Sequence, residues 1–348
     1  MSKRKRTAAE PDVTPADAPP EVSLIIPVYN VAAELPRCLD ACLGQSLRNI
    51  ELIVIDDGAE DESGRICDDY AARDGRIRVI HQANQGVSAA RNAGMNAARG
   101  TWLGFVDGDD FISRRFCELL SRRGRSGGEI VHGTTVLEGF GPQPIADREP
   151  NELIRSHDSP LYFVNGWWAA LYLREYVERR RLRFDPLLSH GEDLLFLMQA
   201  LAPGPRLLQE DAAEYHYCRR PGSADAGSAV HEERAIASYE RSFSALLQLL
   251  YRVQNRFDPD SLGYVWSQLL LRLHHSVARR AADERLRQRC RALEERLARA
   301  CPPASRPSLE KWMAEDARRR EKMARDRAAG AGGGPLSGLR QCPPRAYP

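Results

Sequence analysis

Three aspartates crowd into four positions of the stretch "FVDGDDF". Asp107 and Asp109 are two residues apart, so at the extended end of a strand both side chains point to the same side while Asp110 turns away. Neighbouring carboxylates repel one another, and along the sequence no basic residue follows until Arg114 and Arg115. The crowding therefore predicts that a cation from outside the chain neutralises the cluster.

A hard divalent cation suits Asp107 and Asp109. Mg²⁺ or Mn²⁺ commonly binds one or two carboxylates and completes its coordination with phosphate oxygens and water. Gly108, between the two aspartates, leaves room for a ligand to approach the backbone. The competing interpretation is a solvated aspartate-rich turn, because an isolated D-x-D tripeptide is common by chance. The surrounding sequence has to decide between the two.

A second acidic pair lies in the stretch "SHGEDLLFLMQ". Ser189 and Glu192 have the spacing of a capping box ahead of an apolar helical run, which gives Glu192 a purely structural interpretation. Asp193 projects about a quarter turn away and is oriented to face a substrate. The N-terminus of a helix favours an ionised carboxylate, which suits Asp193 for accepting a proton at neutral pH. Asp193 is therefore the predicted general base.

The elements that must position these carboxylates alternate between strand and helix. Apolar runs predict strands at 22–30, 50–58, 76–82 and 101–106, the second of them buried on both faces. Helical patterns lie between these runs, and the small residues of "GVSAARNAGMNAARG" predict a helix packed closely on the sheet. Strand and helix in alternation predict a mostly parallel sheet with helices on both faces.

In such a sheet the ligand binds beyond the carboxyl ends of the strands. The rule brings polar residues that are distant in sequence to one edge, namely Asn30, Asp56, Asp57, Asn84 and Asp107. This convergence is the main prediction for the site.

The sequence after the D-x-D segment has other strand and helix patterns. "EIVHGTTVL" is a short strand candidate, whereas "WWAALYLREYVERR" and "EDLLFLMQALA" predict helices. Trp167 and Trp168 are interpreted as core residues, with an aromatic platform for a bound ligand as the alternative. From about residue 232 the pattern is helical, and one charged helix carries Leu286, Leu293 and Leu297 on one stripe.

Composition limits the class of protein. A chain of 348 residues suggests two domains, or one domain with an appendage. Hydrophobic residues at 43% and charged residues at 28% indicate a soluble globular protein. A net charge of +2 gives no general case for nucleic-acid binding. No apolar run has the length of a membrane span and the start lacks the apolar segment of a signal peptide, so a cytoplasmic location is expected.

Four stretches in a fixed order, "SLIIPVYN", "IELIVIDDGAEDES", "NQGVSAARNAG" and "FVDGDDFI", resemble the bacterial family 2 glycosyltransferases of the GT-A fold. Farther on, "LYLREYV", "LRFDPLLSHGEDLLFLMQAL" and "YHYCRRPGS" resemble the acceptor half of that family. Each stretch alone is a weak signal, but the ordered set is specific. The resemblance covers about residues 22–223. It implies an α/β fold with a Rossmann-like, mostly parallel sheet covered on both faces, plus a C-terminal helical appendage.

The resemblance also implies roles for residues. The donor is expected to be a nucleotide sugar, usually a UDP-sugar, and the metal Mn²⁺ or Mg²⁺. The implied metal ligands are Asp109 directly and Asp107 beside it, and the implied catalytic residues are Asp193 as base and Glu192. The implied donor-binding residues are Pro27, Tyr29, Asp56, Asp57, Asn84, Arg91, Asp107, Gly108, Arg220 and Ser223.

Three of these residues keep structural alternatives. Asn84 has the position of a cap for the helix that starts near Gly86. Asp57 has the position of an Asp-Gly turn, and Arg91 has that of a surface arginine.

The resemblance divides the chain into a nucleotide-sugar-binding half and an acceptor half, followed by a helical region. The expected ranges are 1–20 disordered, 21–120 donor half, 121–228 acceptor half, 229–327 helical region and 328–348 disordered tail.

The expected function is inverting, metal-dependent glycosyl transfer. The acceptor stays open among a polysaccharide, a lipid-linked molecule, a peptide and a small molecule. Alternatives are an inactive glycosyltransferase-like binding or scaffold protein, a metal-dependent phosphohydrolase and a sugar nucleotidyltransferase. The phosphohydrolase would carry its D-x-D near the first strand, and the nucleotidyltransferase would carry a Gly-rich basic loop there. The C-terminal helices suggest a homodimer through the leucine stripe or peripheral contact of their arginines with anionic lipid, with solvated helices as the default.

Overall fold

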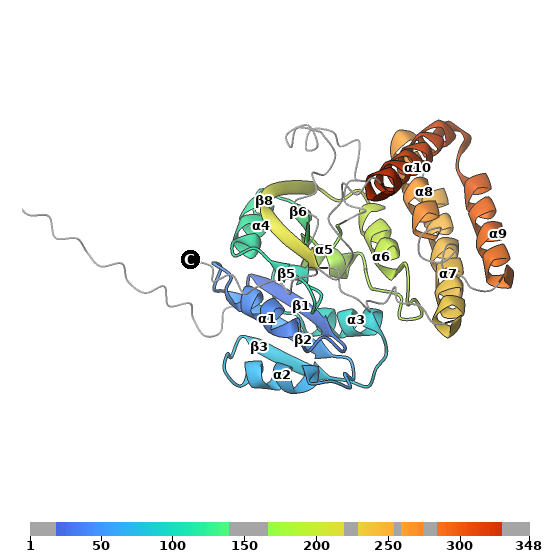
Figure 1. Ribbon diagram of the computed structural model, residues 1–348. Coiled ribbons are helices and arrows are strands. Elements are labelled where there is room, and N and C mark those ends of the chain that lie inside the picture. The colour runs from blue at the N-terminus through green and yellow to red at the C-terminus, as the bar shows by residue number, and fades with distance from the viewer. Residues whose placement is uncertain (1–18, 139–165, 219–228, 254–258, 274–283, 329–348) are drawn as a thin grey trace, which may run out of the picture.

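The computed structural model describes residues 19–138, 166–218, 229–253, 259–273 and 284–328 (Figure 1). The strands are β1 (Val22–Val28), β2 (Ile50–Asp56), β3 (Ile77–His81), β4 (Trp102–Phe105), β5 (Phe111–Ile112), β6 (Ile130–Glu138), β7 (Ala170–Leu173) and β8 (Leu207–Cys218). The helices are α1 (Leu35–Leu43), α2 (Ser63–Ala71), α3 (Val87–Ala97), α4 (Phe116–Gly124), α5 (Arg174–Arg179), α6 (Glu192–Leu201), α7 (Ala229–Val253), α8 (Pro259–Leu273), α9 (Glu284–Ala300) and α10 (Arg306–Ala328), with a 3₁₀ turn at Pro303–Ser305.

The eight strands form one sheet in the order β3-β2-β1-β4-β7-β6-β8-β5. The four strands expected from the sequence, β1 to β4, are parallel neighbours. Beyond them, β7 runs antiparallel to both β4 and β6, β8 is parallel to β6, and β5 is antiparallel to β8. The α/β class is confirmed, and the sheet as a whole is mixed.

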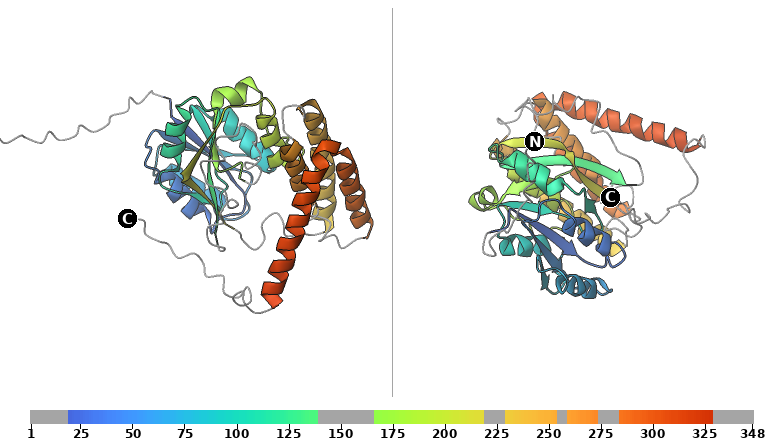
Figure 2. Two further views of the ribbon diagram at one scale, coloured as in Figure 1. Left: turned by 90° about the horizontal axis from the view of Figure 1, so that it is seen from above. Right: turned by 90° about the vertical axis from the view of Figure 1, so that its left-hand side faces the viewer.

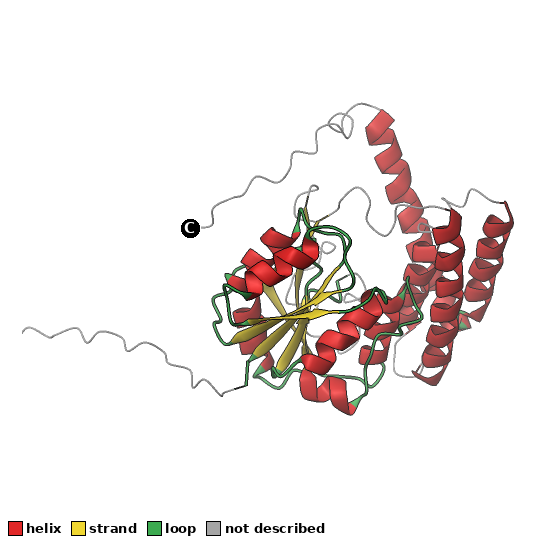
Figure 3. Ribbon diagram, turned by 90° about the horizontal axis from the view of Figure 1, so that it is seen from below, coloured by secondary structure: helices red, strands yellow, loops and turns green. Residues whose placement is uncertain are grey.

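Helices cover both faces of the sheet (Figure 3), which explains why β1 and β2 are apolar at successive positions. In β1, Ile25 belongs to the core cluster that contains Ala90 of α3. Its neighbours Leu24 and Ile26 belong to the opposite cluster, with Leu39 of α1. A strand buried on both faces has no polar face to show, so it reads as a continuous hydrophobic run.

Helix α3 lies unusually close to the sheet. A Cβ added to Gly94 would come within 2.4 Å of Ile25 Cγ2, so any side chain at this position would push the helix off β1. This is the packing that the small residues of α3 predict. It brings the polar residues of α3 near the carboxyl ends of the strands.

The helix expected over residues 167–180 is wrong in its first half. Residues Ala170–Leu173 form β7, which lies between β4 and β6, and only Arg174–Arg179 are helical. A short apolar run fits a strand buried on both faces as well as a buried helix, so periodicity alone does not separate them. Trp167 is a core residue at 1% exposure, whereas Trp168 is partly buried and stacks on Tyr217.

Helices α7 to α10 gather on one side of the sheet, next to α6 (Figures 1 and 2). Their apolar residues Ile236, Tyr239 and Phe243 belong to the same core cluster as Ile25 and the residues of α6. The core therefore runs without interruption from the sheet into the C-terminal helices.

Leucines and arginines of the C-terminal helices contact other residues of the same chain. Leu293 and Leu297 of α9 are buried in this chain's own core, so the two described members of the stripe expected as a dimer contact face inward. Several exposed arginines pair with carboxylates on the same helix, as solvated helices do: Arg287, Arg291, Arg299 and Arg325. Within the described ranges, no helix combines the length and apolar character needed to cross a bilayer.

The buried histidine of β6 predicts a loss of stability in acid. Burial lowers the pKa of His132 to about 4, against an ordinary value near 6.5, although its ring contacts the carbonyl of Gly166. As the pH falls below about 6.5 the unfolded chain gains this proton and the folded chain does not, so the free energy of unfolding falls. We expect His132 to contribute about 2 kcal/mol of this fall between pH 7 and pH 5.

Denaturant unfolding of wild type and His132→Gln at pH 7 and pH 5 measures this effect. Between these two pH values, the free energy of unfolding should fall less for the variant than for wild type. His81→Gln is the matched control with the opposite sign, because the hydrogen bonds that the His81 ring makes to the carboxylates of Asp56 and Asp68 raise the pKa of His81. Its removal should make the acid loss steeper. Parallel pH slopes for wild type and His132→Gln would contradict the prediction.

Candidate active site

Asp56 is the last residue of β2 and Asp57 follows it, and their carboxylates bind different parts of the chain. Asp57 is buried and accepts three hydrogen bonds from the loop before α3, from Gln82 Nε2 at 2.7 Å, Gln85 N at 2.9 Å and Gly86 N at 2.8 Å. Asp56 accepts from the Ala59 amide at 2.9 Å and pairs with His81 Nδ1 at 2.8 Å. The turn after β2 is therefore held by Asp56, and Asp57 fixes the loop that leads into α3.

The D-x-D segment follows β4 at the same edge of the sheet. Asp110 turns into the protein, where Tyr215 Oη donates to it at 2.7 Å and the Cys218 amide at 2.7 Å. Burial, and then the charges of Asp107 and Asp109, raise the pKa of Asp110 to about 8. The repulsion inferred from the sequence is thus present in the folded chain, and it leaves Asp107 and Asp109 as the partly exposed pair.

The structure gives Gly108 a different reason from the expected one. A Cβ at this position would lie 3.1 Å from Val31 Cγ2 and 3.2 Å from the carbonyl oxygen of Pro27. The space beside Gly108 is therefore filled by the end of β1 and the residues after it. Glycine here allows the D-x-D turn to pack against β1.

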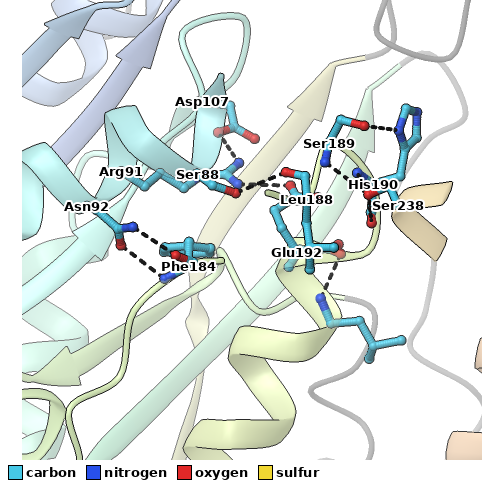
Figure 4. Close-up of polar contacts among 12 residues, drawn as sticks. Ser88, Arg91, Asn92, Asp107, Phe184, Leu188, Ser189, His190, Glu192 and Ser238 are labelled. Atoms are coloured by element: carbon cyan, nitrogen blue, oxygen red, sulfur yellow. Dashed lines mark hydrogen bonds and ion pairs between the residues drawn. The ribbon is translucent and has the colours of Figure 1, made fainter. Parts of the chain in front are cut away.

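Arg91 of α3 connects the two acidic segments (Figure 4). Its Nη2 donates to Asp107 Oδ1 at 2.9 Å and its Nη1 to Glu192 Oε1 at 3.2 Å. The side chain is only 5% exposed, and its guanidinium lies over the rings of Trp167 and Phe184. Burial opposes the charge, but Asp107 and Glu192 outweigh it and raise the pKa of Arg91. The surface-arginine interpretation is wrong.

Glu192 and Asp193 begin helix α6. Burial, and then the neighbouring Asp193, raise the pKa of Glu192 to about 7, although Arg91 acts in the opposite direction. The capping box is wrong, because the N-cap is Gly191 in a left-handed conformation (φ 76°) and no side chain caps the helix. The side chain of Glu192 instead pairs with Arg91. The Oδ1 of Asp193 accepts the Leu194 amide at 2.7 Å.

The polar face of α3 also holds the segment that leads to Glu192. Ser88 Oγ donates to the Leu188 carbonyl at 3.3 Å, and Asn92 exchanges two hydrogen bonds with the backbone of Phe184, at 2.8 and 3.0 Å (Figure 4). Sequence analysis did not single out Ser88 or Asn92. Their spacing with Arg91 (i, i+3, i+4) places all three on one helix face, and that was the available signal.

Arginines distant in sequence reach the aspartate cluster. Arg37 of α1 donates from Nη2 to the main-chain oxygen of Asp109 at 2.7 Å, and Arg91 pairs with Asp107. Arg114 and Arg115, the nearest in sequence, are exposed, and Arg115 pairs with Glu118. Part of the neutralisation assigned to an external cation is thus supplied by the chain itself.

The remaining candidates lie in different surroundings. Pro27 is buried in β1, and Tyr29 is 43% exposed just beyond it. Asn84 is exposed in the loop held by Asp57, and no side chain caps α3, so the capping alternative for Asn84 is wrong. Arg220 and Ser223 lie outside the described residues.

Two carboxylates are available for a metal. Among the described residues, no group of three or more His, Cys, Asp or Glu side chains has the arrangement of a metal site. Asp107 and Asp109 are both partly exposed within the D-x-D segment, and the side chain of Asp107 is 29% exposed. This donor set fits a hard cation that takes its other ligands from phosphate and water.

Comparisons with known proteins agree with this geometry. The family described as Glycosyl transferase family 2 matches residues 23–180. The uncharacterized glycosyltransferase EpsJ of Bacillus subtilis is 39% identical over 59% of this chain, and the chain spans 62% of EpsJ. The succinoglycan biosynthesis protein ExoO of Rhizobium meliloti is 30% identical over 69% of this chain and 73% of its own length. The crystal structure of S. aureus TarS 1-349 with UDP-GlcNAc covers 89% of this chain and 92% of its own, with a TM-score of 0.62 and 17% identity.

The mixed sheet, with carboxylates after β2 and β4 and an acidic helix start opposite them, defines a GT-A glycosyltransferase fold. Within that class, the chain belongs to glycosyl transferase family 2.

Proposed function

We propose that the chain is an inverting, metal-dependent glycosyltransferase that moves a sugar from a UDP-sugar to an acceptor hydroxyl. The observation that carries the proposal is the Arg91 bridge, which joins Asp107 of the D-x-D segment to Glu192 of the acidic pair. The bridge supports the proposal because it connects Asp107, one predicted metal ligand, to Glu192, the neighbour of the predicted base. The TarS structure with UDP-GlcNAc supports a UDP-sugar as the donor class.

Asp109 and Asp107 are the residues that would hold Mn²⁺ or Mg²⁺. The metal, when bound, supplies positive charge that stabilises the departing diphosphate. On the protein side, Arg91 holds the Asp107 carboxylate in place from a buried position. Asp57 orders the loop that carries Asn84, the predicted nucleoside contact.

Asp193 removes the proton of the acceptor hydroxyl. As the acceptor oxygen bonds to the anomeric carbon, the bond from that carbon to the diphosphate oxygen breaks, and the configuration inverts. Glu192 is less suited to this task, because its side chain is only 12% exposed and its Oε1 already accepts a hydrogen bond from Arg91. Asp193 lies one residue further along the helix, about 100° around its axis.

A panel of nucleotide sugars, incubated with the chain in Mn²⁺ or Mg²⁺, tests the proposal through release of the nucleoside diphosphate. We expect UDP release from at least one UDP-sugar and its loss on chelation. A chain that binds UDP but neither hydrolyses nor transfers any sugar would be the binding or scaffold protein instead. Release of free phosphate or formation of a nucleotide sugar would favour the phosphohydrolase or the nucleotidyltransferase.

Asp109→Ala should abolish the metal dependence of donor binding. The change removes a carboxylate, while the contact of Arg37 uses the main-chain oxygen and persists. We expect donor affinity in Mn²⁺ to fall at least about tenfold, or 1.4 kcal/mol, to the value of wild type without metal. Titration calorimetry with and without Mn²⁺ measures this. Asp69→Ala, an exposed carboxylate on α2, is the control, and equal behaviour of the two variants would exclude Asp109 as a ligand.

A further inference from the structure

A single serine of the C-terminal helices holds the turn in front of the acidic pair. Ser238 of α7 is 5% exposed, and its Oγ accepts hydrogen bonds from the amides of Ser189 at 3.0 Å and His190 at 2.9 Å. The same hydroxyl donates to the His190 carbonyl at 2.9 Å. Figure 4 shows Ser238 reaching from α7 to this turn.

These three contacts use the full capacity of a hydroxyl, which has one donor and two acceptor positions. They also satisfy three backbone groups that precede α6 and have no place in its helical ladder. A side chain without a hydroxyl would remove all three of these hydrogen bonds, at a cost in local order. The contact is therefore specific to the chemistry of serine at this position.

Packing of Gly191 against α7 also restricts the turn 189–191. Gly191 adopts φ 76°, and a Cβ added to it would lie 2.9 Å from Ser242 Oγ and 3.6 Å from Tyr239 Cδ1, both on α7. Helix α7 thus contacts Ser189, His190 and Gly191 in succession. Helix α6 starts at the next residue, Glu192.

We propose that Ser238 is a positioning residue for sugar transfer: its hydroxyl fixes the turn 189–191, and through the turn the direction in which Glu192 and Asp193 enter the site. The inference rests on the proposed function, since it assigns Asp193 as base. It gives the C-terminal helices a role that the D-x-D and the acidic pair do not reveal. In this proposal α7 fixes the turn that precedes Asp193, and Arg91 binds the neighbouring residue Glu192.

Ser238→Ala tests the proposal, with Ser244→Ala as the control. Ser244 is an exposed serine on the same helix, and its hydroxyl donates within the helix to the Glu240 carbonyl at 2.7 Å. We expect Ser238→Ala to lower kcat about 10- to 100-fold while the KM and Kd of the donor change less than about twofold, because small misplacements of a catalytic group cost rate rather than donor affinity. Ser244→Ala should keep kcat within about twofold of wild type.

Equal kcat values for the two variants, or a fall in donor affinity as large as the fall in kcat, would overturn the proposal. Amide hydrogen exchange separates this failure from failure of the proposed function, because it needs no substrate. The amides of Ser189 and His190 should exchange faster in Ser238→Ala than in Ser244→Ala. If they exchange equally, the turn is not held by Ser238, whatever reaction the chain catalyses. If they exchange faster but wild type transfers no sugar, the proposed function fails and the role in transfer fails with it.

Discussion

Arg91→Met is expected to destabilise the folded chain by about 3–5 kcal/mol and to reduce sugar transfer to background. Methionine retains apolar contact with the rings of Trp167 and Phe184, so the loss isolates the charge of Arg91. Its removal leaves Asp107 and Glu192 without the cation between them, and the cost is this large because the Glu192 side chain, 12% exposed, has little contact with water. Urea denaturation and a donor transfer assay measure the two effects.

The loss should also depend on pH in a defined direction. Arg91 opposes the rise in the pKa of Glu192, so in Arg91→Met that pKa moves above its value of about 7. A buried carboxyl whose folded pKa exceeds the unfolded one loses stability as the pH rises through the folded value. The stability gap between wild type and variant should therefore be larger at pH 8 than at pH 6.

Arg65→Met is the control for charge removal. Arg65 pairs with Glu62 and Asp69 on the surface of α2, with a side chain that is 65% exposed, so its loss should change stability little. If Arg91→Met unfolds at the same urea concentration as Arg65→Met, the bridge between the acidic segments has no energetic weight.

The sequence predicted the parallel half of the sheet because local composition determines it. Strands β1, β2 and β4 are mostly apolar and buried at every position, and the glycine and alanines of α3 allow its close approach to Ile25. For β7, local composition was insufficient. Its apolar run is compatible with helix and strand, and only the positions of β4 and β6 on either side make it a strand.

The role of Arg91 had no local signal either. An arginine in a helix with mixed neighbours reads as exposed, and its burial depends on two aromatic rings and two carboxylates from distant segments. Ser238 was likewise invisible, because a serine in an amphipathic helix gives no sign of what its hydroxyl contacts. Arg91 contacts Glu192, 101 positions away, and Ser238 contacts His190, 48 positions away, so these contacts are visible only in the folded chain.

Asp193→Asn should separate donor binding from transfer more sharply than any other change in the chain. Asparagine is nearly isosteric, and its amide oxygen can still accept the Leu194 amide, so helix α6 should begin as in wild type. It cannot accept the acceptor's proton, and loss of a general base lowers the rate by about 10²- to 10⁴-fold. Donor affinity in Mn²⁺ should stay within about twofold of wild type.

Glu192→Gln is the informative comparison for this variant. It keeps an oxygen that can accept from Arg91 Nη1, so it tests charge at the neighbouring position with the contact largely preserved. If Asp193 is the base, Glu192→Gln should retain more transfer than Asp193→Asn, and the pH dependence near 7 should weaken because the group that titrates there is gone. If Glu192→Gln instead loses more transfer than Asp193→Asn, Glu192 is the base. The Arg91 bridge would then control the proton acceptor directly, because the arginine that binds Asp107 also sets the protonation of Glu192.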